Sequence, residues 1–185
     1  MIFCKNGELI VRNLELRDKA LIVKWLSDNR VLKYYEGRNN PQDEDMVEAK
    51  FYNDNTDKTR CMIEYSKVPI GYIQFYPVSE EVYKEYGFDF KGIIFGADQF
   101  IGETKYWGRG IGKILMKSMV NFLAAEKSAE KIILDPECWN ERAVKCYEKC
   151  GFKKVKLLPK HEMHEGELRD CWLMEYDVKQ HLNVK

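Results

Sequence analysis

Residues 107–112 read Trp-Gly-Arg-Gly-Ile-Gly, and a helical pattern of apolar residues begins within them. Glycines at 108, 110 and 112 let the backbone approach a ligand closely. The first N–H groups of a helix lack partners inside the helix and carry the positive end of its dipole. Such a turn can bind an anion such as a diphosphate. It matches neither the P-loop nor the G-x-G-x-x-G pattern, so the turn alone leaves a simple loop as the alternative.

The segments around this turn predict a mixed α/β sheet. A strand from about residue 92 to 101 precedes the turn, and a helix with one apolar face follows it. That face consists of Ile111, Ile114, Leu115, Met119, Phe122 and Leu123. A short buried strand at 131–135 ends at Pro136, a helix covers about 140–150, and Gly151 stands where a helix C-terminal glycine belongs. Strands near 151–158 and 170–177 complete the alternation, which favours an α/β fold.

The first half of the chain predicts further strands and two short helices. A strand at 8–14 is followed by a helix through Leu21 and Trp25, with Asp18 as its N-cap. The acidic stretch 36–57 contains a helix near 42–52. Strands at 60–64 and 70–76 are joined by a turn at 66–69, and the segment 76–90 either shapes a cleft or is simple surface. We find no repeat or flexible linker, so we expect one domain over residues 1–185.

Composition excludes several functional classes. The chain has 185 residues, with 30 basic and 30 acidic side chains, and lacks the basic excess typical of nucleic-acid-binding proteins. No apolar run approaches the roughly 20 residues that span a bilayer, and the N-terminus does not resemble a signal peptide. We therefore expect a cytoplasmic protein with no nucleic-acid or membrane partner.

Six cysteines are expected to be reduced thiols in this setting. Cys146 and Cys150 are spaced i, i+4 on the second helix, as two metal ligands would be. The histidines do not complete a usual zinc pattern, so we expect no metal and interpret these thiols as small buried side chains.

Two segments together resemble the GNAT N-acetyltransferases: the glycine turn, and Asn140-Glu-Arg-Ala-Val-Lys-Cys-Tyr-Glu-Lys-Cys-Gly-Phe152. The loop of that family usually reads Gln/Arg-x-x-Gly-x-Gly/Ala, whereas Trp107 stands at its first position here. The resemblance implies a central, mostly antiparallel mixed sheet flanked by helices, with acetyl-CoA as co-substrate. The residues implied to bind it are Phe100, Ile101, Gly108, Arg109, Gly110, Ile111, Gly112, Lys113 and Asn140.

Further segments resemble the aminoglycoside 6′-N-acetyltransferases. They are Asp98–Glu103, Ile133–Pro136, His161–Gly166 and Asp170–Tyr176. This resemblance implies transfer of an acetyl group to the 6′-amine of an aminoglycoside by direct attack in a ternary complex, which confers antibiotic resistance. It implies that Asp98 lies beside the reactive amine and accepts its proton, directly or through water, and that Asp135 holds the cationic rings of the drug.

The residue types suit that substrate, because a polycation requires carboxylates in an open cleft. Asp98 and Asp135 lie near the ends of neighbouring strands, where ligands gather in α/β sheets. Glu103, Asp170 and the acids of 36–57 are weaker candidates, with solvated surface charge as the alternative. Trp25 and Tyr35 are candidate walls for sugar rings, with packing in the core as the alternative.

The expected chemistry needs few groups. The amine must lose a proton to attack, and an aspartate with a reference pKa of about 3.9 acts as much by orienting the ammonium as by accepting that proton. A backbone N–H near Phe100 or Ile101 stabilises the developing oxyanion. The resemblance implies that Tyr147 protonates the thiolate leaving group and that Asn140 contacts the pantetheine arm. The alternatives are a packing tyrosine and a plain N-cap. We expect no covalent acyl-enzyme.

Two other functions remain open at this point. One is a GNAT enzyme for a protein N-terminus or a polyamine, and the other is a noncatalytic acyl-CoA-binding module. We expect a monomer or weak homodimer.

Overall fold

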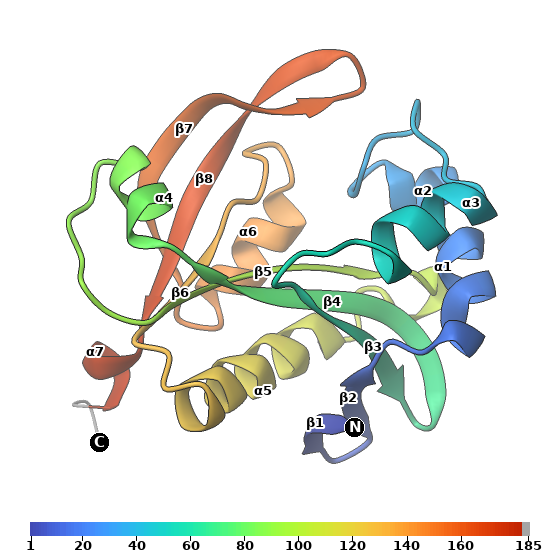
Figure 1. Cartoon of the computed structure of the whole chain (residues 1–185), viewed down its shortest axis with the longest axis horizontal. Helices are drawn as coiled ribbons and strands as arrows, with labels where there is room; N and C mark the ends of the chain where they lie inside the picture. Colours follow the sequence, from blue (N-terminus) through green and yellow to red (C-terminus); the bar gives the residue numbers. More distant parts are fainter. Residues whose placement is uncertain (183–185) are drawn as a thin grey trace.

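The computed structural model describes residues 1–182 of the chain and contains an eight-stranded mixed sheet (Figure 1). The strands lie in the order β1-β2-β3-β4-β5-β6-β8-β7, and only β5 and β6 pair in parallel. Their bounds are Ile2–Asn6 (β1), Leu9–Asn13 (β2), Thr59–Tyr65 (β3), Val68–Val78 (β4), Ile94–Ile101 (β5), Lys131–Leu134 (β6), Lys153–His164 (β7) and Glu167–Asp177 (β8). The expected mixed and mostly antiparallel α/β fold is confirmed.

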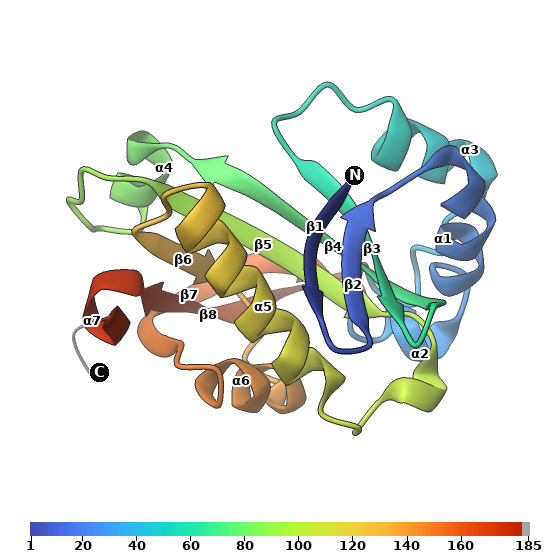
Figure 2. The same cartoon turned by 90° about the horizontal axis from the view of Figure 1, so that it is seen from below.

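Helices flank both faces of the sheet. They are α1 (Lys19–Trp25), α2 (Asn29–Leu32), α3 (Glu44–Val47), α4 (Glu80–Glu85), α5 (Ile111–Glu126), α6 (Glu141–Glu148) and α7 (Val178–Leu182). Short helical turns occupy Leu16–Asp18, Glu48–Tyr52 and Thr104–Tyr106. Figure 2 shows α5 and α6 in front of the sheet, with α1 to α3 grouped at one end of the molecule. Within the described part of the chain, no helix is long and apolar enough to cross a membrane.

The alternation of side chains along the strands produces two large cores on opposite faces of the sheet, and a smaller third cluster contains Tyr83 of α4 and Leu158 of β7. On one face, Phe75 and Ala97 pack with Leu115 and Met119 of α5 and Val144 of α6. The opposite face carries a second core. It contains Met62, Tyr72 and Phe100 from the strands and Trp25, Leu32 and Phe51 from the first helices. A fully buried large apolar side chain stabilises the fold by about 1.5–3 kcal/mol, so these cores fix the helices against the sheet.

Asp18 stands at the N-cap position of α1, as predicted, but its side chain does not cap that helix. Its two carboxylate oxygens accept bonds from Arg12 Nη1 and Nη2 at 2.7 and 2.8 Å, and Oδ2 also accepts from the Glu15 N–H. Arg12 Nε donates to Glu64 at 2.7 Å. This buried network joins β2 and β3 to the first helices, so the carboxylate ties separate elements together.

The structure also contains elements that the sequence pattern did not reveal. Strand β1 pairs with β2, α4 lies inside the segment 76–90, and β7 and β8 extend into one long hairpin. The turn between β3 and β4 consists of Ser66 and Lys67, both with positive φ, so the predicted turn at 66–69 was two residues too long. All six cysteines are free thiols, as expected.

Candidate active site

A cavity of about 880 Å³ opens where β5 and β6 separate. The two strands pair only from Ile94 to Gly96 against Lys131 to Ile133. β5 then continues to Ile101, whereas β6 ends at Leu134 and the chain turns at Pro136, which has no N–H to extend the pairing. The remaining part of β5 therefore borders an open gap in the sheet.

The backbone groups that face this gap follow from the strand register. The Gly102 N–H donates to the Ile70 carbonyl at 2.8 Å on the β4 side. N–H groups alternate in direction along an antiparallel strand, so Phe100 also points its N–H toward β4. The N–H of Ile101 points into the gap. Of the two donors that the sequence suggested for an oxyanion, the structure places Ile101 at the gap.

The glycine turn forms one wall of the cavity. Gly108 and Gly110 have φ of +73° and +76°, and a Cβ at either position would meet no atom within 4 Å. Glycine is therefore suited to these positions by the backbone conformation rather than by a lack of space. Gly110 is the N-cap of α5, and the first turn of that helix contains no acidic residue. The unneutralised helix start faces the cavity, where a diphosphate would be stabilised.

Most residues expected to bind the co-substrate line this cavity. They are Phe100, Ile101, Gly108, Gly110, Ile111, Gly112, Lys113 and Asn140. Arg109 is not part of the lining, and its guanidinium lies 5.5 Å from the ring centroid of Tyr106. Asn140 caps α6, because its side chain accepts from the Ala143 N–H at 3.3 Å. The N-cap interpretation of Asn140 thus describes its contact in this structure.

Trp107, the departure from the usual loop pattern, also lines the cavity. Its Nε1 donates to the Ile101 carbonyl at 2.7 Å, which ties the turn to the end of β5. The Arg142 guanidinium lies 4.1 Å from the centroid of the Trp107 ring and 4.4 Å from that of Tyr34. A cation over two aromatic faces is attracted to both, so Arg142 connects α6 to the opposite wall.

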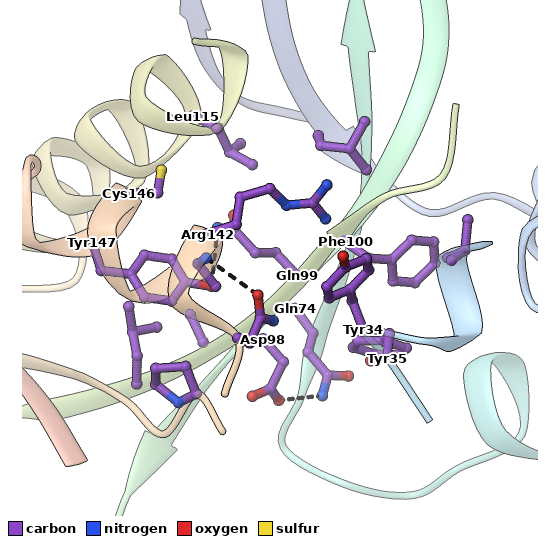
Figure 3. Close-up of a pocket in the computed structure, with 18 of the residues that line it drawn as sticks. Tyr34, Tyr35, Gln74, Asp98, Gln99, Phe100, Leu115, Arg142, Cys146 and Tyr147 are labelled. Atoms are coloured by element: carbon purple, nitrogen blue, oxygen red, sulfur yellow. Dashed lines mark hydrogen bonds between the residues drawn. The ribbon is translucent and has the colours of Figure 1, made fainter. Parts of the chain in front are cut away.

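Asp98 and Tyr147 approach the gap from opposite faces of the sheet. Asp98 shares its face with Phe100 and the second core, whereas Gln99 points to the other face and donates to the Tyr147 hydroxyl at 3.4 Å (Figure 3). Tyr147 projects from α6 and is 8% exposed. Burial raises the pKa of Tyr147, so its hydroxyl is protonated at neutral pH. The gap lets groups on the two faces act on one bound molecule.

Carboxylates gather on the Asp98 side of the cavity. Asp98, Asp135, Glu36, Glu137 and Glu162 all line it. Burial, followed by the charge of Asp135, raises the pKa of Asp98, while a hydrogen bond from Gln74 opposes the rise. Glu162 is exposed on β7, yet partial desolvation in the recess, followed by the charges of Asp135, Glu137 and Asp98, raises its pKa to about 7. Several like charges in one recess destabilise one another, and a cationic ligand would relieve that repulsion.

His161 adds a titratable group at the edge of this acidic cluster. Its Nε2 lies 3.3 Å from Asp135 Oδ2, and that contact raises the pKa of His161. The loop after α2 joins the tip of the β7–β8 hairpin nearby, because Arg38 Nε and Nη2 each lie 2.6 Å from a Glu165 carboxylate oxygen. The hairpin therefore bounds one side of the cavity.

The structure places the remaining predicted residues in two groups. Tyr35 lines the cavity, and its ring centroid lies 4.7 Å from that of Phe100. Trp25 is 1% exposed in the core, where its Nε1 donates to Glu103 at 3.0 Å, and neither residue is part of the lining. Asp170 is exposed and accepts from the Lys160 N–H at 2.8 Å. Of Tyr35, Trp25, Glu103 and Asp170, only Tyr35 lines the cavity.

Several lining residues were missed from the sequence, among them Gln74, Glu137, Arg142 and Glu162. Gln74 interrupts an otherwise apolar run on β4, and a polar residue inside such a strand was a usable signal. Glu162 lies on a part of β7 that the sequence pattern left outside any strand, so no periodicity pointed to it.

The fold and this cavity define an acyl-CoA-dependent acetyltransferase of the GNAT type. Residues 15–159 match the acetyltransferase (GNAT) domain family, and the chain belongs to that family.

Comparison with known proteins gives more particular similarities. The chain is 28% identical over 156 residues to aminoglycoside N(6′)-acetyltransferase type 1 of Klebsiella pneumoniae, covering 80% of this chain and 76% of the relative. A kanamycin resistance protein of Rhizobium radiobacter is 37% identical over 59 residues, which is 32% of this chain and 55% of that protein. These names confirm the resemblance to aminoglycoside 6′-N-acetyltransferases.

Solved structures share the fold over nearly the whole chain. AAC(6′)-Ib in complex with ribostamycin and coenzyme A superposes with a TM-score of 0.77 at 20% identity, covering 97% of this chain and 98% of that one. Spermidine N-acetyltransferase of Vibrio cholerae, in complex with coenzyme A and spermine, superposes with a TM-score of 0.77 at 19% identity, covering 96% and 100%. At these identities the likeness concerns the fold.

Proposed function

We propose that this chain transfers an acetyl group from acetyl-CoA to the 6′-amine of aminoglycosides, without a covalent acyl-enzyme and without a metal. The observation that carries the proposal is the cluster of carboxylates on one face of a gap whose other side holds the glycine turn. A polycationic amine suits the first, and a diphosphate suits the second. The names of the curated relatives favour an aminoglycoside over other cations.

The residues of the turn fit coenzyme A. The free N–H groups at the start of α5, the positive φ of Gly108 and Gly110, and the nearby Lys113 form a cradle for its diphosphate. The gap beside β5 suits an extended arm with amide groups, because backbone donors and acceptors there lack a neighbouring strand. When bound, acetyl-CoA supplies the thioester that is the acetyl donor.

In this proposal Asp98 binds the substrate ammonium and accepts one of its protons, so that the neutral amine can attack the thioester carbonyl. The second proton leaves the nitrogen as the tetrahedral intermediate collapses, and the coenzyme A thiolate takes up a proton as it departs. The raised pKa of Asp98 brings it closer to the working pH of a general base than a solvated aspartate would be. The Ile101 N–H, directed into the gap, donates to the carbonyl oxygen as negative charge develops there. Tyr147 donates to the departing sulfur from the opposite face. Asp135, Glu162 and Tyr35 hold the sugar rings.

Mass spectrometry tests the proposal directly. Kanamycin or tobramycin, incubated with the protein and acetyl-CoA, should gain one acetyl group, located by fragmentation on the sugar that carries the 6′-amine. Spermidine and an N-terminal peptide serve as competing substrates. Asp98→Asn should lower drug-dependent thiol release by about 10²- to 10⁴-fold while coenzyme binding persists. Acetylation of spermidine with no acetylation of any aminoglycoside would refute the assignment, and binding of coenzyme without turnover of any amine would indicate a binding module.

A further inference from the structure

Two buried polar side chains on β4, Tyr72 and Gln74, are not used in the chemistry above. Tyr72 is fully buried, and Gln74 is 8% exposed. Residues two apart on a strand point to the same face of the sheet. The register places Gln74 opposite Asp98 and Tyr72 opposite Phe100 on β5. The two side chains therefore share the face on which the substrate amine would bind.

Hydrogen bonds connect these side chains in one direction. The Tyr72 hydroxyl donates to Gln74 Oε1 at 2.8 Å. Gln74 Nε2 donates in turn to Asp98 Oδ2 at 2.7 Å, the bond drawn between the two side chains in Figure 3. An ionised carboxylate only accepts, so the amide must present its N–H to Asp98. Its carbonyl then faces Tyr72, whose hydroxyl supplies a donor. A flipped amide would place the Gln74 oxygen against the Asp98 carboxylate, so the observed orientation suits an ionised Asp98, and the bond from Tyr72 supports that orientation.

Several other groups face Asp98 from the surrounding elements and act on its charge. Asp135 raises the pKa of Asp98, as burial does, and Lys58 and Tyr76 lower it. The further titratable side chains whose own pKa values respond to the charge of Asp98 are Tyr35, Tyr72, Tyr86, Tyr147 and Glu162. Tyr76, on the same strand as Gln74, also lowers the pKa of Asp98 through a hydrogen bond. Gln74 differs from Tyr76 in that both Gln74 and its own partner Tyr72 are buried, so its amide is held in place from inside the sheet.

We propose that Gln74, oriented by Tyr72, is a positioning residue that fixes one carboxylate oxygen of Asp98 and keeps this carboxylate ionised. The second oxygen is then set to take a proton of the substrate ammonium. The inference rests on the proposed function. The bound ammonium loses one proton to Asp98 before the C–N bond forms, and Asp98 later releases that proton to solvent. The second proton leaves the nitrogen as the tetrahedral intermediate collapses and is balanced by the proton that the departing thiolate takes up. Gln74 keeps both of its amide protons throughout.

Two variants separate positioning from packing. Gln74→Leu removes the donor at similar volume, and Tyr72→Phe removes only the hydroxyl that orients the amide. In Gln74→Leu the acid limb of the kcat/KM profile for kanamycin should move up by about 1–2 pH units, as expected for loss of a hydrogen bond to a charged group. Tyr72→Phe should shift it less, in the same direction. Tyr52→Phe, which removes a phenol that donates to the Glu15 carbonyl outside the cavity, should leave the profile unmoved.

A second measurement needs no substrate. The titration of the Asp98 carboxyl carbon, followed by ¹³C NMR and assigned by its loss in Asp98→Asn, should move to higher pH in Gln74→Leu. If neither this midpoint nor the acid limb moves and only the melting temperature falls, Gln74 is structural and the inference is refuted. If the midpoint moves but the wild-type protein acetylates no aminoglycoside, the positioning of Asp98 stands and the proposed function fails.

Discussion

Replacing Tyr147 by Phe isolates one hydroxyl group in the gap between the strands. The phenyl ring keeps its packing, including the contact with Phe152 at 6.1 Å between ring centroids. From the described residues the lost hydroxyl accepts one long bond of 3.4 Å, donated by Gln99. The stability should therefore fall by less than about 1 kcal/mol, which corresponds to a decrease in melting temperature of at most about 2–4 °C.

The expected effect on the rate follows from the pKa of Tyr147. Burial raises that pKa above the ordinary value of a phenol, whereas a thiol has a reference pKa of about 8.5. Complete proton transfer to the departing thiolate is therefore uphill, and the hydroxyl acts mainly as a hydrogen-bond donor to the developing charge. A bond to a charged group is worth about 1.5–3 kcal/mol, which corresponds to a loss in kcat of about 10- to 160-fold.

Drug-dependent thiol release at saturating acetyl-CoA and kanamycin measures this loss, and calorimetric titration with coenzyme A measures affinity. The affinity should stay within about twofold, because a contact made only as the sulfur departs does not stabilise the bound ground state. Tyr52→Phe is the matched control, because it also removes one phenol hydroxyl, and its kcat should be unchanged. An unchanged kcat in Tyr147→Phe, or a large loss of coenzyme affinity, would refute the role assigned here, and a loss beyond about 10³-fold would contradict the argument from the raised pKa.

Two further predictions concern stability and substrate affinity. Arg12→Met leaves the buried Asp18 and the partly buried Glu64 without their cation. This should destabilise the fold by about 3–5 kcal/mol and lower the melting temperature in calorimetry by about 6–20 °C. A decrease under about 2 °C would contradict this. Glu162 has a pKa raised to about 7, so it loses its negative charge as the pH falls below 7, and the KM for an aminoglycoside should rise about two- to fivefold between pH 8 and 6. Glu162→Gln should remove that component, and an undiminished pH dependence in this variant would exclude Glu162 as its source.

The elements around the glycine turn were predictable because their signals are local. The apolar face of α5 shows in the spacing of its residues along the sequence. The glycine at the N-cap of α5 and the proline after β6 each mark a backbone conformation by their residue type. β1 was missed because it is an edge strand with mostly exposed side chains, which weakens the alternation. α4 carried an unused signal, since Ser79 caps it and two acidic residues follow.

The residues of the candidate site were likewise predictable where a local motif carried them and not where long-range packing placed them. Residues within the two motifs, such as Asp98 and Tyr147, fall on the cavity because the motif and the strand register fix them together. Trp25 and Glu103 moved to the core and its margin because Trp25 packs against Gly102, where a Cβ would lie 2.2 Å from the indole ring. Such long-range packing leaves no periodic trace in the sequence. The hairpin that carries Glu162 was similarly hidden, because its register depends on β8.

The short parallel contact between β5 and β6 has a consequence for the stability of the fold. Three residue pairs of β5 and β6 provide the strand pairing that joins β1–β5 to β6–β8 in the sheet. A ligand whose amides form hydrogen bonds with β5 and with the residues after β6 links the two parts of the sheet. Its binding free energy then adds to the resistance of the chain to unfolding, in proportion to the logarithm of ligand concentration. Under the proposed function, the acetyl-CoA supply of the host would set how durable this protein is as well as how fast it works.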